Sequence, residues 1–363
     1  MTRKFDVIVL GGGPAGASIA ISLLQRGYSV AIIEKSDYSE TRIGETIQPQ
    51  TASLLNHLKI NDEIFHRHLP SNAIQSVWGE SSLKENNFFF NPFGHGWHLN
   101  RLKFDKQLIS HAEKSGATLF TKSLIKTITQ YDSGNCGIEF LDHCHIKTID
   151  TRFVIDATGR NAFFVKNQGG KRLNIDRLIG IVSIQGKKTK QNNSNYTLVE
   201  SAKNGWWYSA DIPDNKMVVA FMTDADMYKK ENCASENFFN RSLSSTKFIN
   251  KRCSESFPDR IRIYAANSYI MTKIHGSNWI AIGDAAMALD PLSSQGIYKA
   301  IKSGVSAAET IHEQFTRNKY ALEIYSNNLN AEFEKYLQLR KLYYLKEKRW
   351  PKSLFWQRRH SGV

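Results

Sequence analysis

Three glycines and one glutamate near the start of the chain have the types and spacing of a dinucleotide-binding site. Gly11, Gly13 and Gly16 form the pattern GxGxxG, and Glu34 follows at the end of the next apolar run. In such a site the first glycine permits a tight turn, the second lets the backbone approach a pyrophosphate, and the third lets a helix pack on a strand. Free N–H groups at the helix start attract phosphate, and the glutamate accepts hydrogen bonds from a ribose. The four residues therefore predict dinucleotide binding.

The segments around these residues have the patterns of the elements that must position them. The β-branched run Val7–Val9 predicts a buried parallel strand, and apolar residues recur at helical spacing from Ile19 to Leu24. Gly27 is expected to end this helix, and "SVAIIE", residues 29–34, predicts a second strand. A strand, a helix and a second strand around one GxGxxG make a chance cluster of glycines a poor explanation.

Two later segments indicate that the dinucleotide is FAD. "FVIDATGR", residues 153–160, is an apolar strand with a polar turn, and residues 278–311 contain "GDAA", the loop "DPLSSQGI" and a helix beginning near Gly296. With these motifs the chain resembles the glutathione-reductase-type FAD monooxygenases, in the tryptophan-halogenase-like branch that also holds geranylgeranyl reductases. The resemblance covers roughly residues 1–310.

The resemblance assigns roles to individual positions. Asp284 would bind a ribityl hydroxyl, and the helix after "DPLSSQGI" would point its N-terminus at the flavin, where it stabilises negative charge. Arg101 and Asp105 match the family's R-x-x-F-D; Asp105 is expected to cap the helix. "TRIGETIQP" matches a turn that approaches the flavin. The full set of expected cofactor residues is Gly11, Gly13, Pro14, Ala15, Gly16, Glu34, Lys35, Arg42, Gly44, Glu45, Thr46, Arg101, Ala157, Gly159, Gly283, Asp284, Pro291, Gly296 and Ile297.

The order of the motifs predicts an α/β fold. It combines a Rossmann-like FAD-binding domain of glutathione-reductase type, an inserted antiparallel β-sheet substrate domain (an α+β layer) and a C-terminal helical segment. The FAD-binding domain is expected at 1–75, 99–178 and 266–315, the substrate domain at 76–98 and 179–265, and the helical segment at 316–363. A polar turn is expected at 188–195. A second GxGxxG is missing, so FAD would be reduced by transiently bound NAD(P)H or by a separate flavin reductase.

The stretch "GWWYSADIP", residues 205–213, bears on the choice of reaction. The halogenase box reads W-x-W-x-I-P, and alignment on Ile-Pro places its tryptophans at Tyr208 and Ala210, so both are missing. The halogenase lysine has no secure counterpart; Lys84 is the nearby candidate. This favours oxygen transfer from a flavin C4a-hydroperoxide over halogenation. Trp206, Trp207 and Tyr208 either line the substrate cavity or fill the core, and no protein residue is assigned a catalytic role.

Three segments, "GDAAMALDPLSSQGIYKAI", "GWWYSADIP" and "SLFWQRR", also resemble the flavoprotein maturases of tryptophylquinone enzymes such as lysine and glycine oxidases and quinohemoprotein amine dehydrogenase. That resemblance implies an FAD-dependent monooxygenase that uses dioxygen to hydroxylate a tryptophan in the precursor of a quinone-cofactor oxidase or dehydrogenase. Two alternatives stay open. One is a monooxygenase or reductase, less plausibly a halogenase, of a small aromatic or isoprenoid metabolite. The other is a chaperone that uses FAD structurally.

Composition narrows the partners. The formal net charge of +14 predicts attraction to an acidic partner, although no nucleic-acid motif is present. The basic stretch 341–359 either packs its aromatic residues on the body or offers a docking site. No apolar run is long enough to span a membrane, and the four scattered cysteines indicate no metal site. The first strand passes directly into the glycine turn without a signal-peptide pattern, which predicts a cytoplasmic protein.

Overall fold

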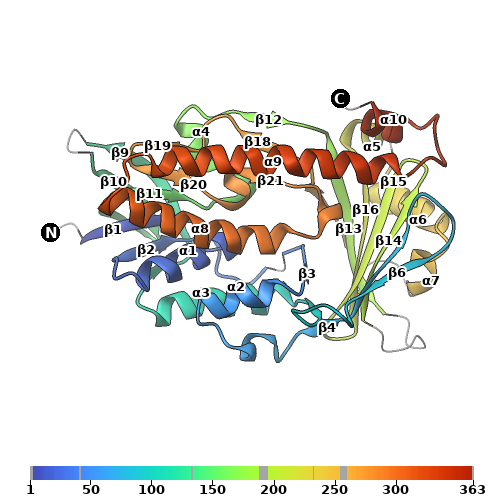
Figure 1. The fold of residues 1–363 in the computed structure, drawn as a ribbon, viewed down its shortest axis with the longest axis horizontal. Coiled ribbons are helices and arrows are strands. Elements are labelled where there is room, and N and C mark those ends of the chain that lie inside the picture. The colour runs from blue at the N-terminus through green and yellow to red at the C-terminus, as the bar shows by residue number, and fades with distance from the viewer. Residues whose placement is uncertain are drawn as a thin grey trace.

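The computed structural model describes residues 3–40, 42–131, 134–187, 195–231, 233–253 and 260–361. It has the predicted α/β fold: a parallel sheet with helices on one side of the molecule and a large, mostly antiparallel sheet on the other (Figure 1). The polar turn expected at 188–195 lies, apart from Asn195, outside the described residues.

The nucleotide half is built on a parallel sheet in the order β20-β11-β1-β2-β8. The strand β19 pairs antiparallel at one edge, and the antiparallel pair β9–β10 extends β11. Its strands are β1 (Arg3–Leu10), β2 (Val30–Ile33), β8 (Thr118–Phe120), β9 (Ser123–Gln130), β10 (Cys136–Asp142), β11 (His145–Asp156), β19 (His275–Gly276) and β20 (Trp279–Ala281). Runs such as "VIVL" are buried along their whole length, as in a parallel sheet covered on both faces.

Helices of this half pack tightly against the sheet and one another. The helices α1 (Pro14–Leu24), α3 (Arg101–Lys114) and α8 (Gly296–Thr316) form one layer, with α1 between the other two. A Cβ at Gly304 would lie 2.7 Å from the carbonyl oxygen of Ala15, so glycine is needed where α8 crosses α1. The remaining helices of this region are α2 (Thr51–His57) and α4 (Phe163–Asn167).

The other half is a seven-stranded sheet in the order β17-β13-β16-β15-β14-β5-β6. All neighbouring strands in it are antiparallel except β14 and β5. Its strands are β5 (Ala73–Val77), β6 (Lys84–Asn87), β13 (Leu178–Gly186), β14 (Tyr196–Ala202), β15 (Gly205–Ile212), β16 (Lys216–Asp224) and β17 (Ile261–Ala265). Apolar side chains cover both faces of this sheet. The helices α5 (Ala225–Lys230), α6 (Ser235–Ser244) and α7 (Ile249–Arg252) lie between β16 and β17 in the chain, and α6 and α7 pack on one face.

Two small sheets join the halves. One has the order β3-β7-β4 and the other β12-β18-β21. Their strands are β3 (Thr46–Ile47), β4 (Leu69–Ser71), β7 (Gly96–His98), β12 (Arg172–Asn174), β18 (Tyr269–Met271) and β21 (Met287–Ala288).

The C-terminal helices span the molecule. The helix α9 (Ala321–Leu345) runs beside α8 and reaches the large sheet, where α10 (Leu354–His360) packs (Figure 1). Phe355 and Trp356 are fully buried, and the guanidinium of Arg359 lies 2.8 Å from the carboxylate of Asp224. Of the two readings of the basic stretch 341–359, the structure therefore supports packing on the body.

Candidate functional site

A cavity of about 1170 Å³ lies between the two halves. The carboxyl ends of β1, β2 and β11 open onto it through Gly11, Glu34 and Ala157, each of which directly or closely follows its strand. Carboxyl ends of adjacent parallel strands are where α/β sheets bind ligands. All the expected cofactor residues line this cavity except Gly16 and Gly283, so segments far apart in the sequence meet in one place.

The glycine loop has the geometry that its sequence predicts. Gly11 has φ +102°, and a Cβ there would lie 2.5 Å from the carbonyl oxygen of Ala157. Gly16 faces the loop rather than the cavity: a Cβ there would lie 1.9 Å from the carbonyl oxygen of Gly11. At Gly13 the nearest atom to a Cβ would be Arg42 Nη1 at 3.7 Å, so this position is open toward the cavity. The loop thus leaves room for a pyrophosphate at the start of α1.

Glu34 is buried beside this loop and already holds part of it. Its Oε2 accepts a hydrogen bond of 2.6 Å from the amide of Gly12, and its Oε1 accepts bonds from the amide and hydroxyl of Ser36. The two oxygens of a carboxylate offer about four acceptor positions, so Oε2 keeps capacity for a ribose hydroxyl. The residue therefore fits the expected ribose-binding role.

Arg101 and Asp105 form a buried pair at the start of α3. Asp105 accepts bonds from Arg101 Nε at 3.1 Å and Nη2 at 3.0 Å, and Arg42 Nη1 lies 3.3 Å away. The expectation that Asp105 caps the helix is wrong, because Asn100 occupies that position and accepts from the Lys103 amide. Arg101 Nη1 also donates to the carbonyls of Ile43 and Gly44, each at 2.8 Å, and so fixes the turn that carries Glu45 and Thr46.

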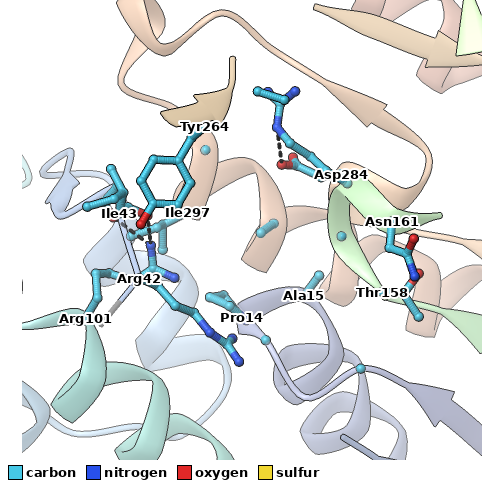
Figure 2. A pocket seen from close by; sticks show the side chains of 18 of the residues that line it. Pro14, Ala15, Arg42, Ile43, Arg101, Thr158, Asn161, Tyr264, Asp284 and Ile297 are labelled. Atoms are coloured by element: carbon cyan, nitrogen blue, oxygen red, sulfur yellow. Dashed lines mark hydrogen bonds and ion pairs between the residues drawn. The ribbon is translucent and has the colours of Figure 1, made fainter. Parts of the chain in front are cut away.

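Asp284 lies on the opposite wall (Figure 2). It pairs with two cations, Arg160 at 3.6 Å and Lys299 at 2.6 Å. Burial acts to raise the pKa of Asp284, but Lys299 and Arg160 outweigh it and hold the pKa below its usual value. Sequence reasoning missed both cations. Lys299 is buried on the side of α8 away from Ile297 and Ile301, and a lysine among apolar helix residues is a signal of a buried ion pair.

The large sheet forms the remaining wall. Its cavity-facing side chains are apolar or small apart from two tyrosines and an arginine: Gly180, Val182, Tyr208, Val218, Ala220, Met222, Arg262 and Tyr264. Figure 2 shows Tyr264 directed toward the first turn of α8 near Ile297. Sequence reasoning missed Tyr264, which the edge strand β17 carries into the wall.

The expectation of a tryptophan wall is wrong for Trp206 and Trp207. Alternation along β15 turns Trp207 to the outer face, where its ring stacks on Phe221 with centroids 4.8 Å apart. Trp206 lies on the same inner face as Tyr208, two residues away along β15. Its Nε1 donates to the hydroxyl of Tyr344 of α9 at 3.0 Å. Both tryptophans are fully buried, and Tyr208 alone of the three contributes to the cavity.

Tyr208 belongs to a hydrogen-bonded row that enters the sheet from the cavity. Its hydroxyl donates to Glu45 Oε1 and lies 2.7 Å from Thr46 Oγ1. Thr46 Oγ1 lies 3.3 Å from Thr197 Oγ1, which lies 3.0 Å from His98 Nε2. Burial raises the pKa of Glu45, against the lowering effect of its hydrogen bonds and of Arg101, and burial lowers the pKa of His98 to about 4.

The chain was then compared with known proteins. Residues 4–338 match the family described as FAD binding domain. The chain belongs to this family. It is accordingly an FAD-dependent oxidoreductase of the group that includes flavin-dependent halogenases, and the predictions of the fold class, of an FAD-binding domain and of an enzyme are confirmed. Among the described residues, no helix combines the length and apolar character needed to cross a bilayer.

Two curated relatives cover most of the chain. It is 29% identical over 365 residues to the putative FAD-dependent oxidoreductase LodB of Marinomonas mediterranea, covering 99% of this chain and 98% of the relative. It is 25% identical over 335 residues to a 1H-pyrrole-2-carbonyl-[peptidyl-carrier protein] brominase of Pseudoalteromonas luteoviolacea, covering 89% of this chain and 81% of the relative.

Solved structures show the same fold. The flavin-dependent halogenase CmlS superposes with a TM-score of 0.89 at 24% identity, covering 99% of this chain and 68% of that one. The peptidyl tryptophan dihydroxylase QhpG, described as essential for tryptophylquinone cofactor biogenesis, superposes with a TM-score of 0.76 at 20% identity, covering 98% of this chain and 79% of that one.

Proposed function

We propose that this protein is an FAD-dependent monooxygenase that hydroxylates a tryptophan side chain of a partner protein during formation of a tryptophylquinone cofactor. The observation that carries the proposal is the cavity of about 1170 Å³, which joins an end lined by the glycine loop and Glu34 to an apolar sheet wall containing Tyr208 and Tyr264. An indole is a flat apolar group with one polar N–H, and such a wall suits it. The likeness to QhpG along nearly the whole chain supports the same substrate class.

In this proposal FAD occupies the nucleotide half, made of 1–75, 99–178 and 266–315. Gly13 and the start of α1 would hold the pyrophosphate, Glu34 the ribose and Asp284 a ribityl hydroxyl, and the first turn of α8 would face the flavin. Bound FAD, once reduced by NAD(P)H or a flavin reductase, supplies the activation of dioxygen.

The remaining work falls to the residues of the chain. The apolar side chains of β13 and β16 exclude water from the ring, because they offer it no hydrogen bond. Tyr208 and Tyr264 orient the ring from two strands on the same face of the sheet. The net charge of +14 favours the approach of an acidic partner surface.

The test is incubation of the FAD-loaded protein with the precursor polypeptide of a candidate quinone oxidase, NADH plus a flavin reductase, and dioxygen. Peptide mass spectrometry should then locate one or two added oxygen atoms on one tryptophan, and heavy dioxygen should label them. A matched precursor with that tryptophan replaced by phenylalanine is the control. Absence of any oxygen addition, together with fast oxidation of free small aromatics, would instead favour a small-metabolite monooxygenase.

Halogenation is the second candidate, because the brominase and CmlS are among the similar proteins. The structure offers little to support it. Lys84 lies on β6 with its side chain 66% exposed and pairs with Glu80, and the described lysines that do line the cavity, Lys35 and Lys122, lie by the nucleotide end. Adding bromide to the same assay separates the candidates: a brominated indole would reject the hydroxylase proposal.

A further inference from the structure

We propose that Glu45 and Tyr208 form the acid–base unit of the reaction, in which the Tyr208 hydroxyl faces the substrate ring and the Glu45 carboxylate receives the proton that the ring loses. This inference rests on the proposed function. Both residues line the cavity, and Glu45 is only 2% exposed, so its proton exchanges through the cavity rather than with bulk water.

Glu45 differs in its partner from three other acidic residues that line the cavity. Glu34, Asp284 and Asp290 also line the cavity, and each lies within ion-pair distance of an arginine or lysine side chain. Glu45 instead accepts from the neutral hydroxyl of Tyr208 and from the Gly44 amide at 3.1 Å. A carboxylate held by a cation is a weak base, because taking up a proton breaks the pair. Glu45 pays no such penalty.

The row of hydroxyls behind Tyr208 points its donors toward Glu45. His98 is buried and neutral near pH 7, and its Nδ1 has no partner. A lone acceptor nitrogen costs less to bury than an unpaired N–H, so we assign the proton to Nε2, which then donates to Thr197. Thr197 in turn donates to Thr46, and Thr46 to Tyr208, so every bond in the row polarises the next toward the carboxylate.

Burial and the nearby Arg101 have opposing effects on the pKa of Glu45. From α3, Arg101 reaches it through the carbonyls of Ile43 and Gly44 and favours the carboxylate form. From α7, Arg252 acts on Tyr208 but lies 2.8 Å from Asp211, which also pairs with Lys187. Burial opposes ionisation of Glu45 and raises its pKa. A base whose pKa is raised in this way suits proton transfer near neutral pH.

The step balances in atoms and electrons. One atom of dioxygen becomes the hydroxyl on the ring carbon and the other leaves as water, while the ring C–H bond and the external reductant each provide two electrons. The ring carbon gives up its hydrogen as a proton, which passes by way of Tyr208 to Glu45. The proton then leaves with water when the product departs, and the carboxylate is restored.

The test compares the FAD-loaded wild-type protein with Glu45→Gln, Tyr208→Phe and the surface control Glu80→Gln. We expect Glu45→Gln to lower kcat about 100-fold and to remove the acidic limb of its pH profile, since general bases contribute on this scale. Tyr208→Phe should lower kcat less than Glu45→Gln does, and the acidic limb of its pH profile should remain but shift in pH. Glu80→Gln should have the kcat and pH profile of the wild-type protein. Wild-type turnover and an unchanged pH profile in Glu45→Gln would overturn the proposal.

A second measurement does not need the substrate. A carboxyl whose pKa in the fold exceeds its ordinary value of 4.5 stabilises the fold at low pH, and this contribution is lost as the pH rises through the raised pKa. A glutamine side chain stays neutral at every pH. When the pH is raised from 5 to 8, the melting temperature of Glu45→Gln should therefore fall less than that of the wild-type protein. If this difference is seen but no tryptophan is ever hydroxylated, the proposed function fails, and Glu45 has a raised pKa without the reaction assigned to it. If hydroxylation occurs and the two slopes are equal, the acid–base inference fails alone.

Discussion

The two ends of the cavity are built in different ways. At the nucleotide end the wall is built from backbone amides, glycines and ion pairs, as in the Gly11–Gly16 loop and the Asp284–Lys299 pair. At the sheet end the wall is built from single side chains on different strands, such as Tyr208 and Tyr264. Positions that need a special backbone conformation tolerate few substitutions, whereas a strand side chain that faces the cavity can be replaced without altering the sheet. The nucleotide end therefore constrains the fold, whereas the side chains at the sheet end can vary while the fold is kept.

The largest expected effect is loss of stability on the outer face of the sheet. Trp207→Ala removes a ring packed between Phe221 and Phe239 and should lower the free energy of unfolding by about 4 kcal/mol. Urea titration of the protein would measure it, with Phe89→Ala, whose side chain is 82% exposed, as the control. FAD affinity of the folded fraction should stay unchanged. A fully stable variant that has lost turnover would instead give Trp207 a role in the site.

Next in size is a glycine that serves packing. In Gly16→Ala the new Cβ would lie 1.9 Å from the Gly11 carbonyl oxygen, so α1 must move off the strand, and we expect a loss of about 3 kcal/mol in unfolding free energy. Gly186→Ala, where no atom lies within 4 Å, is the matched control. Equal stability of the two variants would contradict the geometry of the loop.

Gly13→Ala should separate binding from folding. The space around Gly13 is open in the protein, so apoprotein stability should change by less than about 0.5 kcal/mol. A pyrophosphate lying against this backbone would meet the new methyl group, and FAD affinity should fall about 100-fold, or about 2.7 kcal/mol. Flavin fluorescence titration measures the change. Undiminished affinity would mean that FAD does not approach Gly13.

The smallest expected effect lies at His98, which is buried on β7 in the small sheet that joins the two halves. Burial lowers its pKa from 6.5 to about 4, so the neutral ring stabilises the fold above pH 6.5 and this stability is lost as the pH falls toward 4. From pH 7.5 to pH 5 the loss should be about 2 kcal/mol. His98→Asn should show a shallower pH dependence in urea titrations, and an identical slope would show that the fold does not lower the pKa of His98.

The sequence was informative where function depends on neighbouring residues. The glycine loop, Glu34 and the turn after β11 are contiguous motifs, and the strands and helix around them have strong periodic patterns, so their meeting at one cavity could be predicted. Lys299 was missed because its partner Asp284 approaches it through the 3₁₀ turn Gly283–Ala285 rather than along one helix.

The sheet end could not be predicted to the same degree. Trp206 and Trp207 are adjacent in sequence but lie on opposite faces, and only the register of β15 against β16 decides which face meets the cavity. Tyr208 and Glu45 come from distant segments whose contact depends on the small sheet that joins the halves.

The position of α10 has a consequence for synthesis of the protein. Phe355 and Trp356 complete the apolar cluster that contains Trp206, and Arg359 neutralises the buried Asp224. Until α10 has left the ribosome, the part of the inner face around Trp206 lacks these side chains, and Asp224 lacks its arginine partners. A nascent or truncated chain without α10 is therefore expected to associate through this face.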